Sequence, residues 1–310
     1  MPGNDSCVLS CDERSDDSQF DAVKQEFYQV HSTRRLQWAV VMTTAAFKRT
    51  VRAYYRAHGR SFPWRETNDA YAIYVSEMML QQTQTERVLP KYREWHERFP
   101  DCAACAASPL PAVIACWNGL GYNRRARYLH ETCKKIVTEF SGVFPDDVPT
   151  LETLPGIGPY TARAIATFAF NKPEIFIETN IRSVFIHSFF SDSDVPVSDA
   201  AIMPLIAETV DTTNPREWYY ALMDYGAYIK KQFPNPSRNS TTYAKQSRFS
   251  GSLREARGAV LRCLSRGQPL TPAHIARQET IDMARLLTAI EQLKKEGFIR
   301  QSGRLLTLAP

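Results

Sequence analysis

The residues best suited to chemistry lie in a turn at positions 154–161, which reads Leu-Pro-Gly-Ile-Gly-Pro-Tyr-Thr. Gly156 and Gly158 allow the backbone to approach a partner closely, and the amides that begin the next helix point outward with the positive end of its dipole. Such a turn suits a phosphate group. A tight connection between two helices explains the same pattern, so these residues alone leave the ligand open.

The elements that position this turn are predicted to be helices. From residue 42 to about residue 233, apolar residues recur at the helical spacing and Pro or Gly residues interrupt them, with almost no alternation typical of strands. The expected helices are Leu110–Trp117, Arg125–Phe140, Tyr160–Phe170, Asn180–Phe190, Asp199–Val210 and Glu217–Ile229, preceded by an amphipathic segment from Met42 with Phe47, Val51, Tyr54 and Tyr55. The sequence therefore predicts an all-α body.

A second, smaller domain is predicted at the C-terminus. Residues 234–252 are rich in Pro, Ser, Asn and Thr, which indicates a linker or an extended arm. Residues 253–310 predict three helices, the second capped by Thr271 and Pro272, and a β-hairpin over 298–308. We expect one buried face on the third helix, made by Met283, Leu286, Leu287, Ile290 and Leu293. This pattern is typical of a winged helix-turn-helix.

Positive charge is concentrated in that second domain. The chain carries a net charge of +5, and residues 237–310 hold 13 basic against 5 acidic side chains, whereas residues 42–236 hold 21 of each. A basic unit attached to a neutral body favours nucleic-acid binding, because neutralising phosphates supplies non-specific affinity. A merely soluble surface would account for the same charge.

The absence of long apolar runs and the cysteine count indicate the compartment in which the protein works. Residues 1–41 lack an apolar period and predict a flexible leader, and no apolar run reaches the roughly 18–20 residues of a membrane span. Seven cysteines are an odd number in a chain long enough to fold without disulfides. We therefore expect an intracellular protein in a reducing compartment, with no membrane partner.

Four blocks of sequence, taken together, resemble the helix-hairpin-helix DNA glycosylases, and in particular the MutY-type adenine glycosylases. They are Phe62–Arg65, Ser76–Thr83, Trp117–Tyr122, and the turn at 154–161 followed by Glu178 and Asn180–Arg182, and they keep the family's order over roughly residues 45–230. The resemblance implies two helical subdomains that flank a cleft, within residues 42–233. It also implies a monofunctional enzyme that hydrolyses the N-glycosidic bond of a mispaired base, most simply adenine opposite guanine or 8-oxoguanine.

Breaking that bond requires an acid that protonates the departing base and a negative group that stabilises the oxocarbenium-like sugar. By resemblance, Glu77 is the acid, and Glu178 stands where the family carries an aspartate that stabilises the sugar cation. A solvated helix residue is the alternative interpretation of Glu77, but its apolar neighbours predict a raised pKa for its carboxyl and favour the acid. We expect the two carboxylates to converge on one extruded nucleotide.

The resemblance also implies supporting residues. Tyr160 and Asn180 contact the nucleotide and orient the carboxylates, and Tyr160 replaces the lysine with which bifunctional relatives form a Schiff base. Trp64 and Arg65 belong to the base pocket. The expected DNA contacts are Gln82, Thr83, Leu120, Tyr122, Gly156, Ile157, Gly158 and Arg124, with Arg125 and Arg127 beside them. Core packing explains Leu120 and Tyr122 nearly as well, and a solvated face explains the arginines.

The chain departs from the family pattern at three places. Glu178 replaces the aspartate and moves the carboxylate by about 1.5 Å, where a misplacement of about 1 Å can cost a hundredfold in rate. No cysteine occurs between Cys133 and Cys263, so the family's four ligands of a [4Fe–4S] cluster are missing, and we expect no cofactor or metal. Residues 230–252, where the cluster ligands would lie, must then be held in place by other contacts. A winged helix replaces the family's Nudix-like domain, so recognition of 8-oxoguanine is not implied.

Three functions remain open at this point. The first is an adenine glycosylase acting on double-stranded DNA that contains a mismatch or a damaged base. The second is a mismatch-specific thymine or uracil glycosylase, since Tyr160 also fits that branch, and the third is a degenerate protein that binds duplex DNA without cutting it. Cys102, Cys105, Cys116 and Cys133 are expected to be core thiols instead of zinc ligands.

Overall fold

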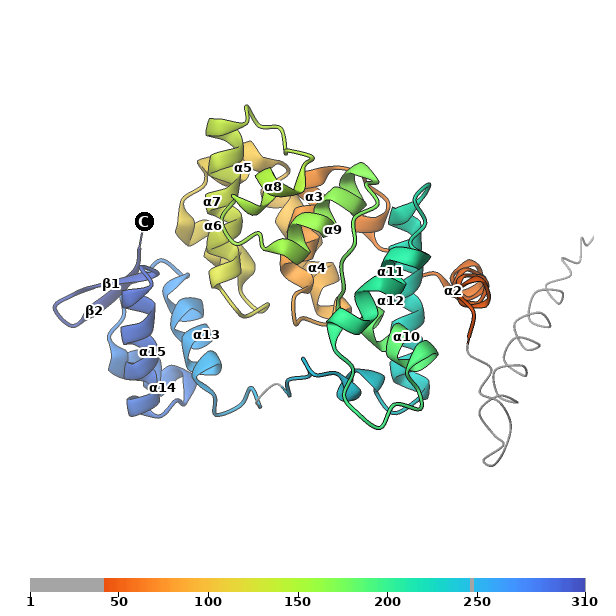
Figure 1. Cartoon of the computed structure of the whole chain (residues 1–310). Coiled ribbons are helices and arrows are strands. Elements are labelled where there is room, and N and C mark those ends of the chain that lie inside the picture. Colours follow the sequence, from red (N-terminus) through yellow and green to blue (C-terminus); the bar gives the residue numbers. More distant parts are fainter. Residues whose placement is uncertain (1–41, 246–247, 310) are drawn as a thin grey trace, which may run out of the picture. The chain divides into compact units, whose positions relative to one another are not determined.

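The computed structural model describes residues 42–245 and 248–309, so the predicted leader at 1–41 lies outside the described part. The described part is helical apart from one two-stranded sheet near the C-terminus, which confirms the predicted all-α class (Figure 1). The chain divides into two compact units. The first contains described residues 42–60 and 177–243, and the second contains residues 61–176 and most of 244–310. None of the described helices is long and apolar enough to cross a membrane.

The first unit is a helical bundle. Its elements are α2 (Thr44–His58), α10 (Thr179–Phe189), α11 (Asp199–Thr209), α12 (Pro215–Gln232) and the 3-10 helix η2 (Pro236–Asn239). Thr43 caps α2 by accepting a hydrogen bond from the Ala46 amide at 3.2 Å. The Phe47 ring packs 5.0 Å from the rings of both Phe185 and Phe189, so the apolar stripe of α2 faces α10 as its spacing predicts.

A buried ion pair ties the end of α2 to α12. The Asp224 side chain is 1% exposed, and its two carboxylate oxygens accept hydrogen bonds from the Arg60 amide at 2.8 Å and from the Arg60 guanidinium at 2.6 and 2.8 Å. A buried carboxylate is tolerated when such donors satisfy it. The chain leaving α2 is therefore fixed against α12.

Residues after α12 close the first unit through hydrogen bonds. The Ser237 hydroxyl lies 2.5 Å from the Ser183 hydroxyl and 3.2 Å from the Thr179 carbonyl oxygen, so η2 is pinned to α10. The Val197 amide donates to the Asn239 carbonyl at 2.8 Å, and the Thr241 amide donates to the Val197 carbonyl at 3.0 Å. This edge is thus held by ordinary polar contacts, as the sequence requires of residues 230–252.

The second unit contains the remaining elements and one continuous apolar core. They are η1 (Pro63–Arg65), α3 (Ala70–Leu80), α4 (Thr85–Arg98), α5 (Cys102–Ala107), α6 (Leu110–Trp117), α7 (Arg124–Glu139), α8 (Val148–Glu152), α9 (Pro159–Phe170), α13 (Leu253–Leu264), α14 (Pro272–Glu279), α15 (Met283–Lys295), β1 (Ile299–Ser302) and β2 (Leu305–Leu308). The predicted helix at 110–117 matches α6 at both ends. The other predicted helices differ by one to three residues at an end.

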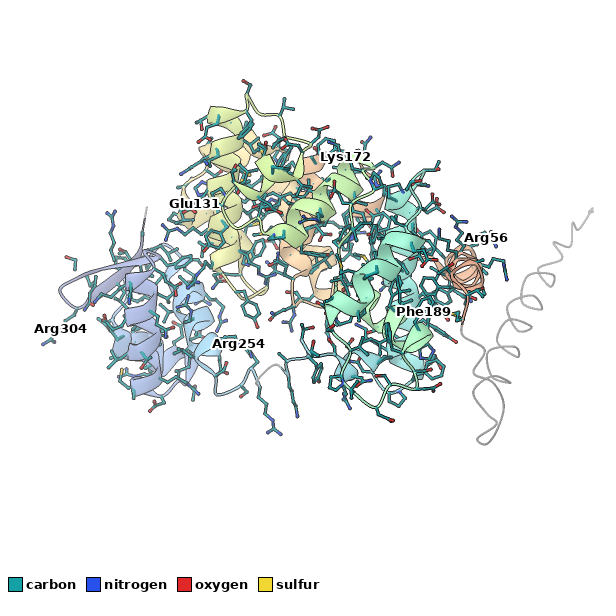
Figure 2. All side chains as sticks on the ribbon, viewed as in Figure 1. Arg56, Glu131, Lys172, Phe189, Arg254 and Arg304 are labelled. Atoms are coloured by element: carbon teal, nitrogen blue, oxygen red, sulfur yellow. The ribbon has the colours of Figure 1, made fainter. Side chains whose placement is uncertain are left out.

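The C-terminal part has the predicted order of three helices and a hairpin. Thr271 caps α14 by accepting a hydrogen bond from the His274 amide, and Gly297 ends α15 with a φ of +72°. β1 and β2 pair antiparallel, and Arg304 projects at their turn (Figure 2).

The prediction that five apolar residues of α15 form one buried face is partly wrong. Leu286, Ile290 and Leu293 are buried, whereas Met283 and Leu287 are 39% and 45% exposed. The buried residues follow the spacing i, i+4, i+7 and pack toward α13. Met283 and Leu287 lie at the flank of that stripe, so the buried stripe is narrower than the apolar pattern.

Two helical glycines should respond in opposite directions to the same substitution. A Cβ at Gly226 of α12 would lie 2.7 Å from the carbonyl carbon of Asn180, whereas a Cβ at Gly258 of α13 would meet nothing within 4 Å. We expect Gly226→Ala to destabilise the protein by about 1–3 kcal/mol through overpacking. Gly258→Ala should stabilise it by about 0.5–1 kcal/mol, because alanine favours the helix. Urea unfolding of both variants measures the two effects, and equal shifts would contradict the packing of α12 on α10.

Candidate active site

Glu77 lies on a helix that is buried on nearly every side. Asp69 caps α3 by accepting hydrogen bonds from the amides of Tyr71 at 3.3 Å and Ala72 at 3.0 Å. The nine residues from Tyr71 to Met79 are all buried, because the sequence there is apolar almost throughout. Glu77 is 7% exposed within this run. The solvated interpretation of Glu77 is therefore wrong, and its carboxyl is shielded from bulk water.

The Glu77 carboxylate is in contact with the helix that follows the glycine turn. The Tyr160 hydroxyl donates a hydrogen bond to Glu77 Oε2 at 3.0 Å. Tyr160 is the second residue of α9, and its ring packs edge-on against Phe176 with centroids 5.7 Å apart. Two sequence blocks separated by 83 positions thus meet at one carboxyl group.

In the turn at 154–161, internal packing explains one of the two glycines and does not explain the other. Gly156 has a φ of +73°, and a Cβ there would lie 2.6 Å from Tyr128 Cγ. Ile157 is buried. Gly158, the N-cap of α9, has a φ of −97°, and a Cβ there would meet nothing within 4 Å. Internal packing therefore accounts for Gly156 but gives no reason for a glycine at 158.

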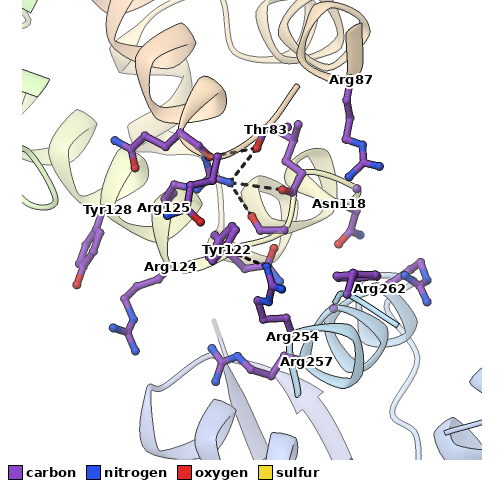
Figure 3. A pocket seen from close by; sticks show the side chains of 18 of the residues that line it. Thr83, Arg87, Asn118, Tyr122, Arg124, Arg125, Tyr128, Arg254, Arg257 and Arg262 are labelled. Carbon is purple, nitrogen blue, oxygen red and sulfur yellow. Dashed lines mark hydrogen bonds between the residues drawn. The ribbon is translucent and has the colours of Figure 1, made fainter. Parts of the chain in front are cut away.

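Arg125 is the residue that the sequence analysis placed least well. It is 7% exposed, which contradicts the solvated face, whereas its expected position beside a DNA backbone stays a prediction. Its guanidinium donates to the carbonyl oxygens of Met78 at 2.6 Å and Gln81 at 2.7 Å, and to that of Gly121 at 3.2 Å (Figure 3). Burial lowers its pKa to about 10. Arg125 thus joins the end of α3 to the turn that precedes α7.

Four of the candidate DNA-contacting residues lie in the two loops that Arg125 joins. Gln82 has a φ of +54° and is exposed, and the Thr83 hydroxyl donates to the Gln81 carbonyl at 3.2 Å. Leu120 is 4% exposed and belongs to the apolar core, as the packing interpretation expects. Tyr122 differs, because it is 38% exposed with a φ of +49°.

Two arginines on α7 are bonded to the C-terminal part. The exposed Arg124 forms an ion pair with Glu296 at 2.9 Å. Arg127 donates to the Glu296 carbonyl oxygen and to the Glu131 carboxylate, the latter at 2.8 Å. Both therefore have partners within the chain.

Trp64 and Arg65 form part of an aromatic stack. The Trp64 ring is stacked on Phe62 with centroids 4.9 Å apart and planes 8° apart, and it packs edge-on against Tyr92 at 5.2 Å. Trp64 is buried, whereas Arg65 is partly exposed with its guanidinium 5.2 Å from the Phe62 ring. The role of Trp64 and Arg65 in a base pocket stays a prediction.

The second carboxylate belongs to the first unit, where it caps a helix. Glu178 Oε1 accepts hydrogen bonds from the amides of Asn180 at 2.7 Å and Ile181 at 2.8 Å, and Oε2 accepts one from the Asn180 side chain at 3.1 Å. A negative side chain at a helix N-terminus interacts favourably with the helix dipole. Burial lowers the pKa of the nearby Lys230, and the negative charge of Glu178 opposes that shift.

The residues present do not fit the four-thiolate ligand set of a [4Fe–4S] cluster. Residues 177–243 contain no cysteine, and their edge is closed by the contacts of η2. Cys102, Cys105, Cys116 and Cys133 are buried and unbridged in the second unit, as predicted for core thiols, with the sulfurs of Cys102 and Cys133 3.6 Å apart. The described residues include no group of three or more His, Cys, Asp or Glu side chains suited to a metal ion.

A family model matches residues 75–205 of the chain, and it is described as the HhH-GPD superfamily of base excision DNA repair proteins. The matched range contains Glu77, the glycine turn and Glu178. The match therefore includes both carboxylates and the turn between them.

Individual proteins support the same assignment. The chain is 35% identical to an adenine DNA glycosylase of Mycolicibacterium smegmatis over 271 residues, which cover 79% of this chain and 89% of that protein. It is 31% identical to one of Mycobacterium tuberculosis over 276 residues, which cover 81% and 89%. A thermostable thymine-DNA glycosylase of known structure shares the fold, with a TM-score of 0.55 and 23% identity over 62% of this chain and 90% of that one. The chain belongs to the MutY-type adenine DNA glycosylase family of the helix-hairpin-helix superfamily.

Proposed function

We propose that this protein excises mispaired adenine from duplex DNA in base excision repair, by hydrolysing the N-glycosidic bond and leaving an abasic site. The relatives named adenine DNA glycosylase support the substrate. The observation that carries the proposal is the hydrogen bond from the Tyr160 hydroxyl to the buried Glu77 carboxyl, because it joins two sequence blocks around one acid. The base opposite adenine is guanine or 8-oxoguanine.

Glu77 acts as the general acid. Adenine is a poor leaving group unless a ring nitrogen accepts a proton, and a carboxyl shielded from water can hold a proton for that transfer. The hydrogen bond from Tyr160 fixes the orientation of Oε2. The proton passes from the Glu77 carboxyl to the extruded base as the bond between that base and the sugar C1′ breaks.

Glu178 stabilises the positive sugar that remains. Its carboxylate is held by two backbone amides and by the Asn180 side chain, so its position is fixed before substrate arrives. Water then adds to C1′ and gives its proton to the carboxylate. Asn180 is a positioning residue in this scheme, because it acts through Glu178.

The reaction ends with the abasic site and needs no cofactor. Tyr160 offers no amine at the hairpin, so we propose no covalent intermediate at this position and no strand cleavage through it. The contacts of Ser237 and Asn239 hold the edge that the cluster closes in the family. We further propose that the protein acts as a monomer on DNA in the cytoplasm or nucleoid.

Removing the acid should stop excision without stopping binding. We expect Glu77→Gln to lower the single-turnover rate on an A·G or A·8-oxoguanine duplex by about 10²–10⁴, the usual contribution of a general acid. Its affinity for the same duplex should stay within a few-fold of wild type. Glu97→Gln, an exposed glutamine substitution on α4, is the matched control and should keep the full rate. A Glu77→Gln protein with wild-type rate would show that another group protonates the base.

The charge and length of Glu178 can be tested separately. Glu178→Gln removes the charge and should lower the rate by about 10²–10³. Glu178→Asp keeps both the charge and an N-cap and should stay within about tenfold of wild type. The assay includes T·G and U·G duplexes beside the adenine mispairs. A wild-type protein inert on every duplex but tightly bound to DNA, and activated by Glu178→Asp, would instead identify a degenerate binding protein.

The two glycines of the turn should separate folding from DNA binding. Gly158→Ala meets open space, so the melting temperature should not change, but the added methyl group obstructs a phosphate at the N-terminus of α9. We expect about tenfold weaker duplex binding, measured by fluorescence anisotropy. Gly156→Ala should instead lower the melting temperature, because its Cβ collides with Tyr128. Unchanged binding by Gly158→Ala would leave the turn as a structural connection only.

A further inference from the structure

The winged helix and the loops beyond the catalytic helix enclose a basic cleft within the second unit. The cleft has a volume of about 770 Å³, and its two walls are α13 and the turn before α7 (Figure 3). Six arginines line it, and Glu296 is the one acidic residue among the described residues of its lining. A cleft with this excess of guanidinium groups suits an anionic ligand.

Three cations of the winged helix lie on α13, and others lie on α14, α15 and the hairpin. Arg254, Arg257 and Arg262 all line the cleft, and Arg87 and Arg124 lie across from them (Figure 3). A helix-turn-helix ordinarily presents its second helix to a DNA groove, which here is α15. The exposed flank of α15 carries Met283 and Leu287, at 39% and 45% exposure. The arginines that line the cleft therefore favour α13 as the side that meets a polyanion.

Tyr122 gives the cleft a second chemical feature. Its ring lies between two guanidinium groups, that of Arg125 at 5.3 Å and that of Arg254 at 5.5 Å. The Arg254 guanidinium also donates to the Tyr122 hydroxyl at 2.7 Å. Single-stranded nucleic acid is commonly bound by such a combination, with a base stacked on an aromatic ring and its phosphates on arginine.

Ion pairs and hydrogen bonds fix the two walls. Glu296 binds Arg124 at 2.9 Å and Arg257 at 2.6 Å, so one carboxylate connects α7, α13 and the end of α15. Asn118 donates to the Ser265 hydroxyl at 2.8 Å. Because these side chains are already held in place, little conformational entropy is lost when a ligand binds in the cleft.

We propose that this cleft binds the sugar–phosphate backbone of DNA beside the reacting nucleotide, with α13 in place of α15 as the DNA-facing helix of the winged helix. The proposal rests on the proposed function, which brings DNA to α3. Gln82 lines the cleft only two residues beyond the end of α3, the helix that carries Glu77.

The test removes two charges from the cleft and two from the surfaces that a winged helix ordinarily uses. Arg254→Gln with Arg262→Gln alters α13. Lys295→Gln with Arg304→Gln removes the same charge from the end of α15 and the hairpin turn, where both side chains are exposed. Each protein is titrated with an A·G duplex at several salt concentrations, and its melting temperature is measured to verify folding.

We expect the cleft variant to bind at least about tenfold more weakly, with a slope of log affinity against log salt that is smaller by about 2. The control variant should keep the wild-type slope. An equal loss of affinity in both variants would show that only the net charge matters. A loss of affinity in the control alone would assign DNA binding to α15 and the hairpin. Either result overturns the proposal.

Excision is measured on the same proteins to separate the two proposals. A wild-type protein that binds the duplex but releases no adenine contradicts the proposed function and leaves the cleft result intact. If excision is normal and the cleft variant keeps the wild-type salt slope, only the cleft proposal is contradicted. A wild-type protein that binds no duplex contradicts both.

Discussion

The second unit depends on the burial of one guanidinium group. The last carbonyl oxygens of any helix lack partners within the helix, and Arg125 supplies donors to those of Met78 and Met79 at the end of α3. It also reaches the Gln81 carbonyl beyond that end and the Gly121 carbonyl in the opposite loop. Only arginine presents five N–H donors on a rigid plane, so no other side chain could satisfy this many oxygens at once.

The contacts of Arg125 also affect the loop that follows α3 and two nearby aromatic residues. Because Arg125 ends α3 at a fixed point, it also fixes the turn of the chain at Gln82, where φ is positive. The guanidinium lies 5.4 Å from the Trp117 ring and 5.3 Å from the Tyr122 ring. A buried cation thus contacts the end of α3, the loop after it and the aromatic wall of the cleft. Its positive charge also interacts favourably with the negative end of the α3 dipole.

In the first unit, the edge after α12 is closed by a short 3-10 helix and a few hydrogen bonds. Ser237 binds both Ser183 and the Thr179 carbonyl next to Glu178, so the closing segment also supports the start of α10. Gly226 lets α12 approach the Asn180 backbone closely. The helix that carries Glu178 is thereby held from two sides without thiolate ligands.

The sequence by itself determined the order and type of the elements, because Pro, Gly and capping residues mark helix ends locally, as at Leu110–Trp117 and Thr271. It also predicted Glu77 and Tyr160 as site residues, since their motifs are short and contiguous, and the structure brings the two side chains into contact. Tertiary structure decided which side chains are buried. It placed Leu120 in the core and Tyr122 at the surface, exposed Met283 and Leu287, and buried Arg125. Burial depends on which surfaces pack together, and a charged residue is buried only where distant carbonyl oxygens converge on it, which no local pattern encodes.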